Sequence, residues 1–133
     1  TGEITETADV EVLFEDANPM KDGGATVTDG IRLTSNMTYT VSGKNVSMTK
    51  VSGTYTNIGL YYYTDPHVVY SNSSGTYRTS KTPTSSSWSY NPNSGYVAYL
   101  PDLPPFVNSW ATCNVAGMSG GEYEVECLFT LVL

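Results

Sequence analysis

Twelve residues at the end of the sequence, Glu122-Tyr-Glu-Val-Glu-Cys-Leu-Phe-Thr-Leu-Val-Leu133, decide the fold class. Side chains of an extended strand alternate between two faces. One face of this stretch is apolar and consists of Tyr123, Val125, Cys127, Phe129, Leu131 and Leu133. The other face starts with three glutamates and turns apolar at Leu128 and Val132. We therefore expect a strand that begins half-exposed, ends buried on both faces and closes a β-sheet core.

Alternation of the same kind recurs through the rest of the chain. In residues 3–14 it produces an apolar face made of Ile4, Ala8, Val10, Val12 and Phe14. A hairpin is predicted where residues 37–41 and 46–48 alternate on either side of the turn 42–45. Further strands are expected at 25–28, 31–33, 58–64, 67–71, 76–80, 87–90, 96–100 and 106–113.

Turn signals separate these strands every 8 to 12 residues or so, and no stretch shows helical periodicity. Three prolines in residues 101–105 exclude a central strand there and indicate a crossing between sheets or over an edge. The sequence predicts an all-β chain with a single domain over residues 1–133. Its architecture is a two-sheet antiparallel β-sandwich, Ig-like or jelly-roll, of about nine or ten short strands.

The composition indicates which classes of partner the chain can bind and where the protein is located. Charged residues make up 14% of the chain, against about 25% in an average domain. The net charge is −7 and the six cations are scattered, which argues against nucleic acid as a partner. No apolar run approaches the roughly 20 residues of a membrane span. An uncharged polar composition is typical of strand-rich proteins outside the cell, so we expect an extracellular, cell-surface or virion-surface protein.

Cys113 and Cys127 are the only cysteines. An extracellular location favours a disulfide between them, and two buried free thiols are the alternative. With a single histidine, the chain cannot supply four Cys/His ligands for structural zinc, and no cofactor is predicted. Asp16, Asp22 and Asp29 resemble calcium ligands only loosely, because their spacing matches no known loop pattern, so we interpret them as solvated turn acids.

Aromatic residues concentrate in the middle of the chain. The candidates for an interface or for sugar stacking are Tyr61, Tyr62, Tyr63, Trp88, Tyr90 and Trp110. Such rings fill a core, form a subunit contact, or stack on carbohydrate, and the sequence leaves all three open. Three glycosylation sequons begin at Asn36, Asn45 and Asn72.

Catalytic signatures are missing from the sequence. A hydrolase triad has only His67 to use, with Asp65 two residues before it and no nucleophile elbow nearby. A glycosidase needs two facing acids, whereas nine of the thirteen acids fall in residues 3–16 and 122–126. We expect a protein that is not an enzyme.

The acidic terminal segments bear on assembly. Like charges opposite each other destabilise a strand pair, so these two segments should not pair along their acidic halves. We predict that residues 3–14 complete the sheet of a neighbouring subunit, with an ordinary intrachain first strand as the alternative. The predicted function is an extracellular structural or adhesive subunit that self-assembles into a fibre, pilus-like filament, surface layer or viral appendage. The alternative is a carbohydrate-binding β-sandwich module, so the expected partners are other copies of the chain or carbohydrate.

Overall fold

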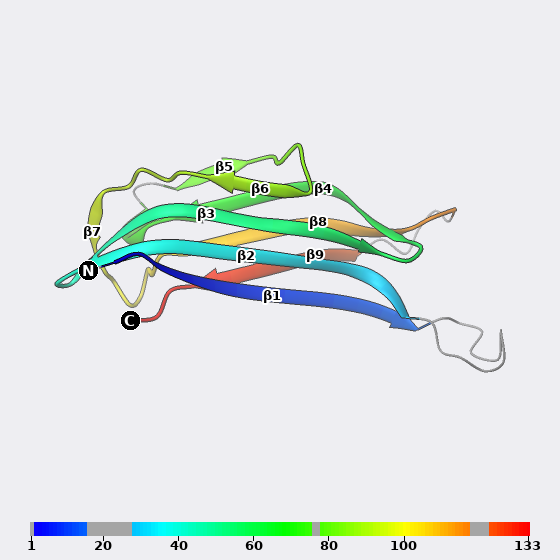
Figure 1. Ribbon diagram of the computed structural model, residues 1–133, viewed down its shortest axis with the longest axis horizontal. Coiled ribbons are helices and arrows are strands. Elements are labelled where there is room, and N and C mark those ends of the chain that lie inside the picture. The colour runs from blue at the N-terminus through cyan, green and yellow to red at the C-terminus, as the bar shows by residue number, and fades with distance from the viewer. Residues whose placement is uncertain (1, 16–27, 76–77, 118–122) are drawn as a thin grey trace.

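Two antiparallel β-sheets pack face to face in a computed structural model that describes residues 2–15, 28–75, 78–117 and 123–133. Figure 1 shows an elongated sandwich with one sheet in front of the other, and both chain ends lie at the same end of the molecule. The predicted all-β sandwich is confirmed. The described residues include no helix that is long and apolar enough to cross a membrane.

Sheet A has the order β1-β2-β3-β6, and β7 also pairs with β3. Its strands are β1 (Ile4–Glu15), β2 (Thr28–Ser42), β3 (Asn45–Ile58), β6 (Ser87–Tyr90) and β7 (Tyr96–Ala98). Sheet B has the order β5-β4-β8-β9. Its strands are β5 (Thr79–Lys81), β4 (Tyr61–Ser71), β8 (Phe106–Val115) and β9 (Tyr123–Thr130). Residues 101–105 connect β7 of sheet A to β8 of sheet B, so the predicted crossing is confirmed.

Several predicted strands merge or lengthen. Residue 28 and the segments 31–33 and 37–41 belong to one strand, β2, and residues 25–27 of the predicted segment 25–28 lie outside the described residues. β2 and β3 form the predicted hairpin with Ser42 opposite Asn45. The predicted segment 58–64 is wrong at its start, because Ile58 ends β3 and β4 begins after a turn at Tyr61. Residues 61–64 and the segment 67–71 join into β4 through an irregularity between Thr64 and His67. Strands of this length are not the short ones expected. Of the predicted segment 76–80, residues 76 and 77 lie outside the described residues.

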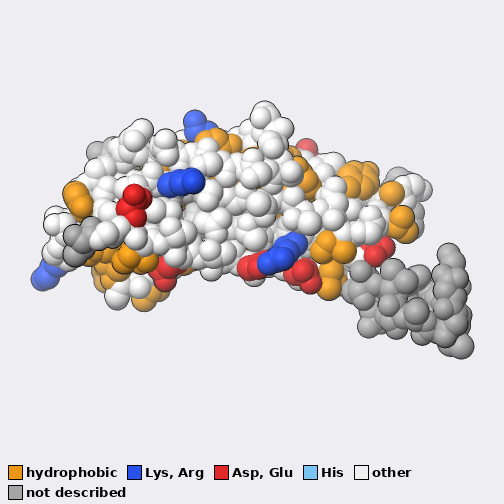
Figure 2. All heavy atoms as spheres, in the orientation of Figure 1, with side chains coloured by type: hydrophobic (Ala, Val, Ile, Leu, Met, Phe, Trp, Pro, Cys, Tyr) orange, Lys and Arg blue, Asp and Glu red, His pale blue; other side chains and the backbone are white. Residues whose placement is uncertain are grey.

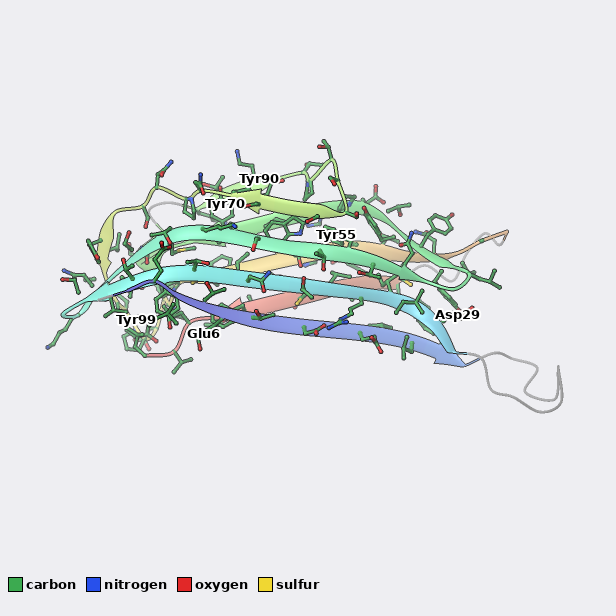
Figure 3. The ribbon with its side chains drawn as sticks, viewed as in Figure 1. Glu6, Asp29, Tyr55, Tyr70, Tyr90 and Tyr99 are labelled. Atoms are coloured by element: carbon green, nitrogen blue, oxygen red, sulfur yellow. The ribbon has the colours of Figure 1, made fainter. Side chains whose placement is uncertain are left out.

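The core lies between the sheets and follows the inward positions of each strand. It includes Ile31, Leu33, Met37, Val46, Met48, Val51, Val68, Val107, Ala111, Val125 and Leu131. Aromatic rings complete it, among them Tyr55, Tyr70 and Tyr90, which are labelled in Figure 3. Period-two burial along β2, β3 and β8 explains why these segments fold as strands with one face in the core.

β1 pairs with β2 along its whole length, from Ile4 opposite Tyr39 to Glu15 opposite Thr28. Its side chains Ala8, Val10, Val12 and Phe14 pack against the core. The single chain therefore contains the ordinary intrachain arrangement, and strand exchange between subunits stays a prediction. β1 and β9 belong to different sheets, which confirms that the two acidic strands do not pair with each other.

The outward side chains of β9 are more exposed than the sequence predicts. Leu128 and Val132 are 48% and 79% exposed, whereas Val125, Cys127 and Leu131 are buried. The expectation that the strand ends buried on both faces is wrong, because the outer face of sheet B is open to solvent along β9.

The predicted disulfide is also wrong. Both cysteines are free and fully buried. In the β8–β9 ladder Cys113 lies opposite Tyr123, and Cys127 lies opposite Ser109. Four residues of strand separate the two positions, about 13 Å. A disulfide needs Cα atoms within about 7 Å, so pairing would require a different register.

Candidate functional site

An open cavity of about 460 Å³ lies on the outer face of sheet B. We call it the outer groove, and its lining includes Asn72, Arg78, Asp102, Phe106, Asn108, Trp110, Leu128 and Thr130. Figure 2 shows the opposite side of the molecule, the outer face of sheet A, so the groove lies on the far side of that view. Three strands supply its floor, and two connecting segments supply its wall.

The floor follows from the register of β4, β8 and β9. Ladder pairing aligns three rows of outward side chains across the sheet. These rows are Ser71–Phe106–Thr130, Val69–Asn108–Leu128 and His67–Trp110–Glu126. Because alternate residues of β8 point outward, Phe106, Asn108 and Trp110 stand in one line over about 13 Å.

Two aromatic rings mark the ends of this line. The Trp110 indole stacks on the His67 imidazole with ring centroids 4.7 Å apart and an interplanar angle of 12°. The Arg78 guanidinium lies 5.7 Å from the centre of the Phe106 ring, within the range of a cation–π contact. The groove thus has an aromatic surface at each end of its floor.

Between the rings lies an amide with an unmet acceptor. Asn108 is 7% exposed, and its Nδ2 donates a hydrogen bond to Glu126 Oε2 at 3.3 Å. Its Oδ1 is buried without a hydrogen-bond partner among the described residues. A buried acceptor without a donor costs about 1 to 3 kcal/mol, so a ligand hydroxyl group that reached this atom would gain from the bond.

The wall is fixed by a buried asparagine. Asn72 Nδ2 donates to Val46 O and to Ser94 Oγ, both at 2.9 Å, and Asn72 Oδ1 accepts the Ser73 N–H at 2.7 Å. The Ser74 N–H bonds to Leu103 O at 3.3 Å and joins the two wall segments. Asn72 is 1% exposed, so the folded chain does not present this sequon for a glycan, and the prediction at this position is wrong.

The other sequons lie elsewhere. Asn36 is in the middle of β2, where its amide accepts a bond from Thr7 and donates one to Ser52. Asn45 is exposed at the β2–β3 turn, so glycosylation there stays a prediction.

The six predicted aromatics do not gather in one site. Trp88 is 5% exposed in the core and stacks on Tyr90. Tyr61 stacks on Phe14, and Tyr63 stacks on Tyr55, whereas Tyr62 is 40% exposed on the outer face of sheet B. Rings of residues 61–63 therefore occupy both faces of the strand. Of the six, Trp110 alone lines the groove in the part of the chain that the structure describes.

Sequence reasoning missed Phe106, Asn108, Leu128, Arg78 and Asp102. The alternation Phe106-x-Asn108-x-Trp110 was a usable signal, because it puts two rings and an amide on the same face of one strand. The wall residues had no such signal, since segments 72–75 and 102–104 meet only in the folded chain.

Metal binding finds no support in the described residues, where no group of three or more His, Cys, Asp or Glu side chains could hold an ion. Asp29 lies at one end of the sandwich (Figure 3) and accepts a hydrogen bond from the Leu60 N–H at 3.2 Å. Asp16 and Asp22 lie outside the described residues.

Comparisons with protein-family models, with curated proteins and with solved structures give no match to this chain, so its function has to be inferred from the residues of the outer groove.

Proposed function

We propose that this protein binds neutral carbohydrate chains in the outer groove. The observation that supports the proposal is the outward line Phe106–Asn108–Trp110, in which an amide with an unmet acceptor lies between two aromatic rings. This arrangement favours carbohydrate binding, the alternative to self-assembly in the sequence analysis, because the groove supplies a site of defined chemistry.

The chemistry of a sugar matches these groups. A pyranose ring has an apolar C–H face and an edge of hydroxyl groups, so it can stack on a flat ring while donating hydrogen bonds beside it. Trp110 and Phe106 offer the flat surfaces. Asn108 Oδ1 offers an acceptor, after the small rotation of its amide that would expose the atom to a hydroxyl group.

Charge favours a neutral ligand. Among the described residues, the groove is lined by one cation, Arg78, and one anion, Asp102, whose charges balance. The chain as a whole has a net charge of −7, which repels polyanions over the range of unscreened charges. Neutral polysaccharides of the kind found outside cells therefore fit best, in line with the extracellular location that the composition predicts. Binding without catalysis is proposed, because the sequence lacks a catalytic signature.

Native affinity electrophoresis tests the proposal. The probes are mixed-linkage β-glucan, xyloglucan, galactomannan and soluble starch, each cast in the gel. We expect at least one of them to retard the wild-type chain and to release the Trp110→Ala variant. Tyr96→Ala is the matched control, since it removes a 54% exposed ring from sheet A and should be retarded like the wild type. The proposal would be contradicted if none of the four polysaccharides retarded the wild-type chain. It would also be contradicted if Trp110→Ala were retarded as much as the wild type.

Self-assembly is a second candidate, favoured by the position of β1 at the end of sheet A. An end strand leaves one row of backbone groups for pairing with another chain. Its exposed side chains Ile4 and Leu13 add apolar surface. Light scattering of the native protein separates the candidates, because large polymers support assembly and a stable monomer contradicts it.

A further inference from the structure

A kink in β4 determines which of its residues face the groove. Asp65 and Pro66 together oppose the single residue Ala111, since Thr64 pairs with Thr112 and His67 pairs with Trp110. This is a β-bulge, and Asp65 adopts the left-handed conformation at φ 53°. The extra residue reverses the alternation. Tyr63 points into the core before it, and His67 points outward after it.

A core tyrosine of the opposite sheet reaches this bulge. Tyr55 on β3 is 3% exposed and belongs to the core between the two sheets (labelled in Figure 3). Its hydroxyl lies 3.1 Å from Trp110 O and 3.3 Å from His67 O. One hydroxyl hydrogen is thus shared between the carbonyls of the two residues whose rings stack outside. Burial raises the pKa of Tyr55 well above its ordinary value, so the hydroxyl stays a donor.

We infer that Tyr55 is a positioning residue for the outer groove, an inference that rests on the proposed carbohydrate binding. Its hydroxyl holds the carbonyls of His67 and Trp110 at the bulge, and this fixes the imidazole–indole stack on the other side of the sheet. The imidazole covers one face of the indole, so the stack decides which part of Trp110 a sugar can contact. Tyr55 itself lies in the core and does not touch the ligand.

Tyr55→Phe tests the inference, because it removes the hydroxyl and keeps the ring that stacks on Tyr63 at 4.8 Å. The chain has two tryptophans, so an ¹⁵N correlation spectrum shows two indole N–H signals, which a Trp110→Phe variant assigns. We expect Tyr55→Phe to shift or broaden the Trp110 signal. We also expect it to weaken binding of the best-retained polysaccharide about two- to tenfold, the effect of one hydrogen bond.

Tyr63→Phe is the matched control, since it removes a hydroxyl from the neighbouring ring. An unchanged Trp110 signal in Tyr55→Phe, or an equal shift in Tyr63→Phe, would overturn the inference. Replacement of Tyr55 by 4-aminophenylalanine restores a donor and should restore the signal. If Tyr55→Phe does not fold, the 4-aminophenylalanine variant tests the inference in its place. A folded 4-aminophenylalanine variant whose Trp110 signal is displaced from the wild-type position would overturn the inference. If the wild type binds no polysaccharide, the proposed function fails, while the Trp110 signal still tests the positioning role.

Discussion

The outer faces of the two sheets differ in how their polar side chains are satisfied. On sheet A, hydroxyl and amide groups of neighbouring strands bond to one another. Four such bonds are Thr5–Thr38 at 2.9 Å, Thr7–Asn36 at 2.6 Å, Thr34–Thr54 at 2.7 Å and Asn36–Ser52 at 3.3 Å. Figure 2 shows few charged or hydrophobic side chains over the middle of this face. The side chains in these four bonds therefore already have partners on their own sheet.

The outer face of sheet B has the opposite character. It has aromatic rings at Phe106 and Trp110, an exposed Leu128, and an acceptor on Asn108 that is buried without a partner among the described residues. Both faces belong to one sandwich with one core, so the difference does not come from the fold. It comes from the outward residues alone, and for this reason we propose sheet B as the ligand-binding side.

Deleting residues 1–14 should have the largest effect. It removes β1 from sheet A and uncovers the core that Val10, Val12 and Phe14 contact. Each fully buried apolar side chain contributes about 1.5 to 3 kcal/mol, and a whole domain has a net stability of about 5 to 15 kcal/mol. We expect a chain without cooperative urea unfolding by circular dichroism.

A truncated chain that stays folded and monomeric would instead show that β1 belongs to another subunit. That result would support the predicted strand exchange. The outer face of sheet A would then have to be described without β1 of the same chain.

The two tryptophans separate stability from binding. Trp88 is 5% exposed and packs against Gly53, where an added Cβ would come within 2.4 Å of the ring. Trp88→Ala should cost about 3 to 5 kcal/mol of unfolding free energy, as for other buried aromatics. Trp110→Ala should cost less than half of that and abolish polysaccharide binding. Urea unfolding and affinity electrophoresis of both variants measure this, and equal effects on both properties would contradict a site on sheet B.

Alkaline pH should weaken the inner contacts of sheet A. The Tyr39 hydroxyl donates to Glu6 Oε2 at 2.7 Å, and burial together with this bond raises the pKa of Tyr39 to about 12. In the unfolded chain tyrosine ionises near pH 10 or so. The stabilisation is fully present below this value, and it is lost as the pH rises to about 12, because the unfolded chain releases its proton first.

Urea midpoints measured between pH 8 and pH 12 should therefore fall less steeply for Tyr39→Phe than for the wild type. Some slope should remain, because the pKa of Tyr55 is raised as well. If the urea midpoints of the two proteins fell equally with pH, the Tyr39 hydroxyl would not contribute to the loss of stability at alkaline pH.

The smallest effect is expected on the outer face of sheet A. Thr34→Val removes the 2.7 Å bond to Thr54 Oγ1 and the 3.0 Å bond that the Thr54 N–H donates to Thr34 Oγ1, and it keeps a β-branched side chain that suits a strand. We expect a loss of about 0.5 to 1.5 kcal/mol of unfolding free energy and unchanged polysaccharide binding. Weaker binding in this variant would extend the site to sheet A.

Local periodicity predicted much of the fold. Alternation located β1, the β2–β3 hairpin, β6, β8 and β9, because each has one face in the core. It divided β2 at Asp29-Gly30, which has the composition of a turn. In the structure Gly30 lies within the strand, opposite Leu13 of β1. The position requires glycine, because a Cβ there would come within 1.8 Å of Val12 O on β1. The glycine marks a close approach of two backbones, which the sequence alone does not distinguish from a turn.

The candidate site was less predictable, for two physical reasons. The bulge at Asp65-Pro66 reverses the alternation of β4, so simple counting gives His67 the wrong face. The wall of the groove combines segments 72–75 and 102–104, which are brought together by the Ser74–Leu103 bond and the buried Asn72. Long-range packing of this kind leaves no periodic trace. Similarly, Cys127 and Cys113 suited a disulfide by composition, and only the ladder register separates them.

The most direct test of a carbohydrate site on sheet B is backbone amide mapping. ¹⁵N-labelled protein is titrated with oligosaccharides released from the best-retained polysaccharide, or with those of all four probes if the gels show no retardation. We predict that the largest chemical-shift changes fall on residues 72–75 and 106–110, and that β2 residues such as Thr34 and Asn36 change least. Changes concentrated on β1 and β2, or no changes with any of the four, would contradict the account.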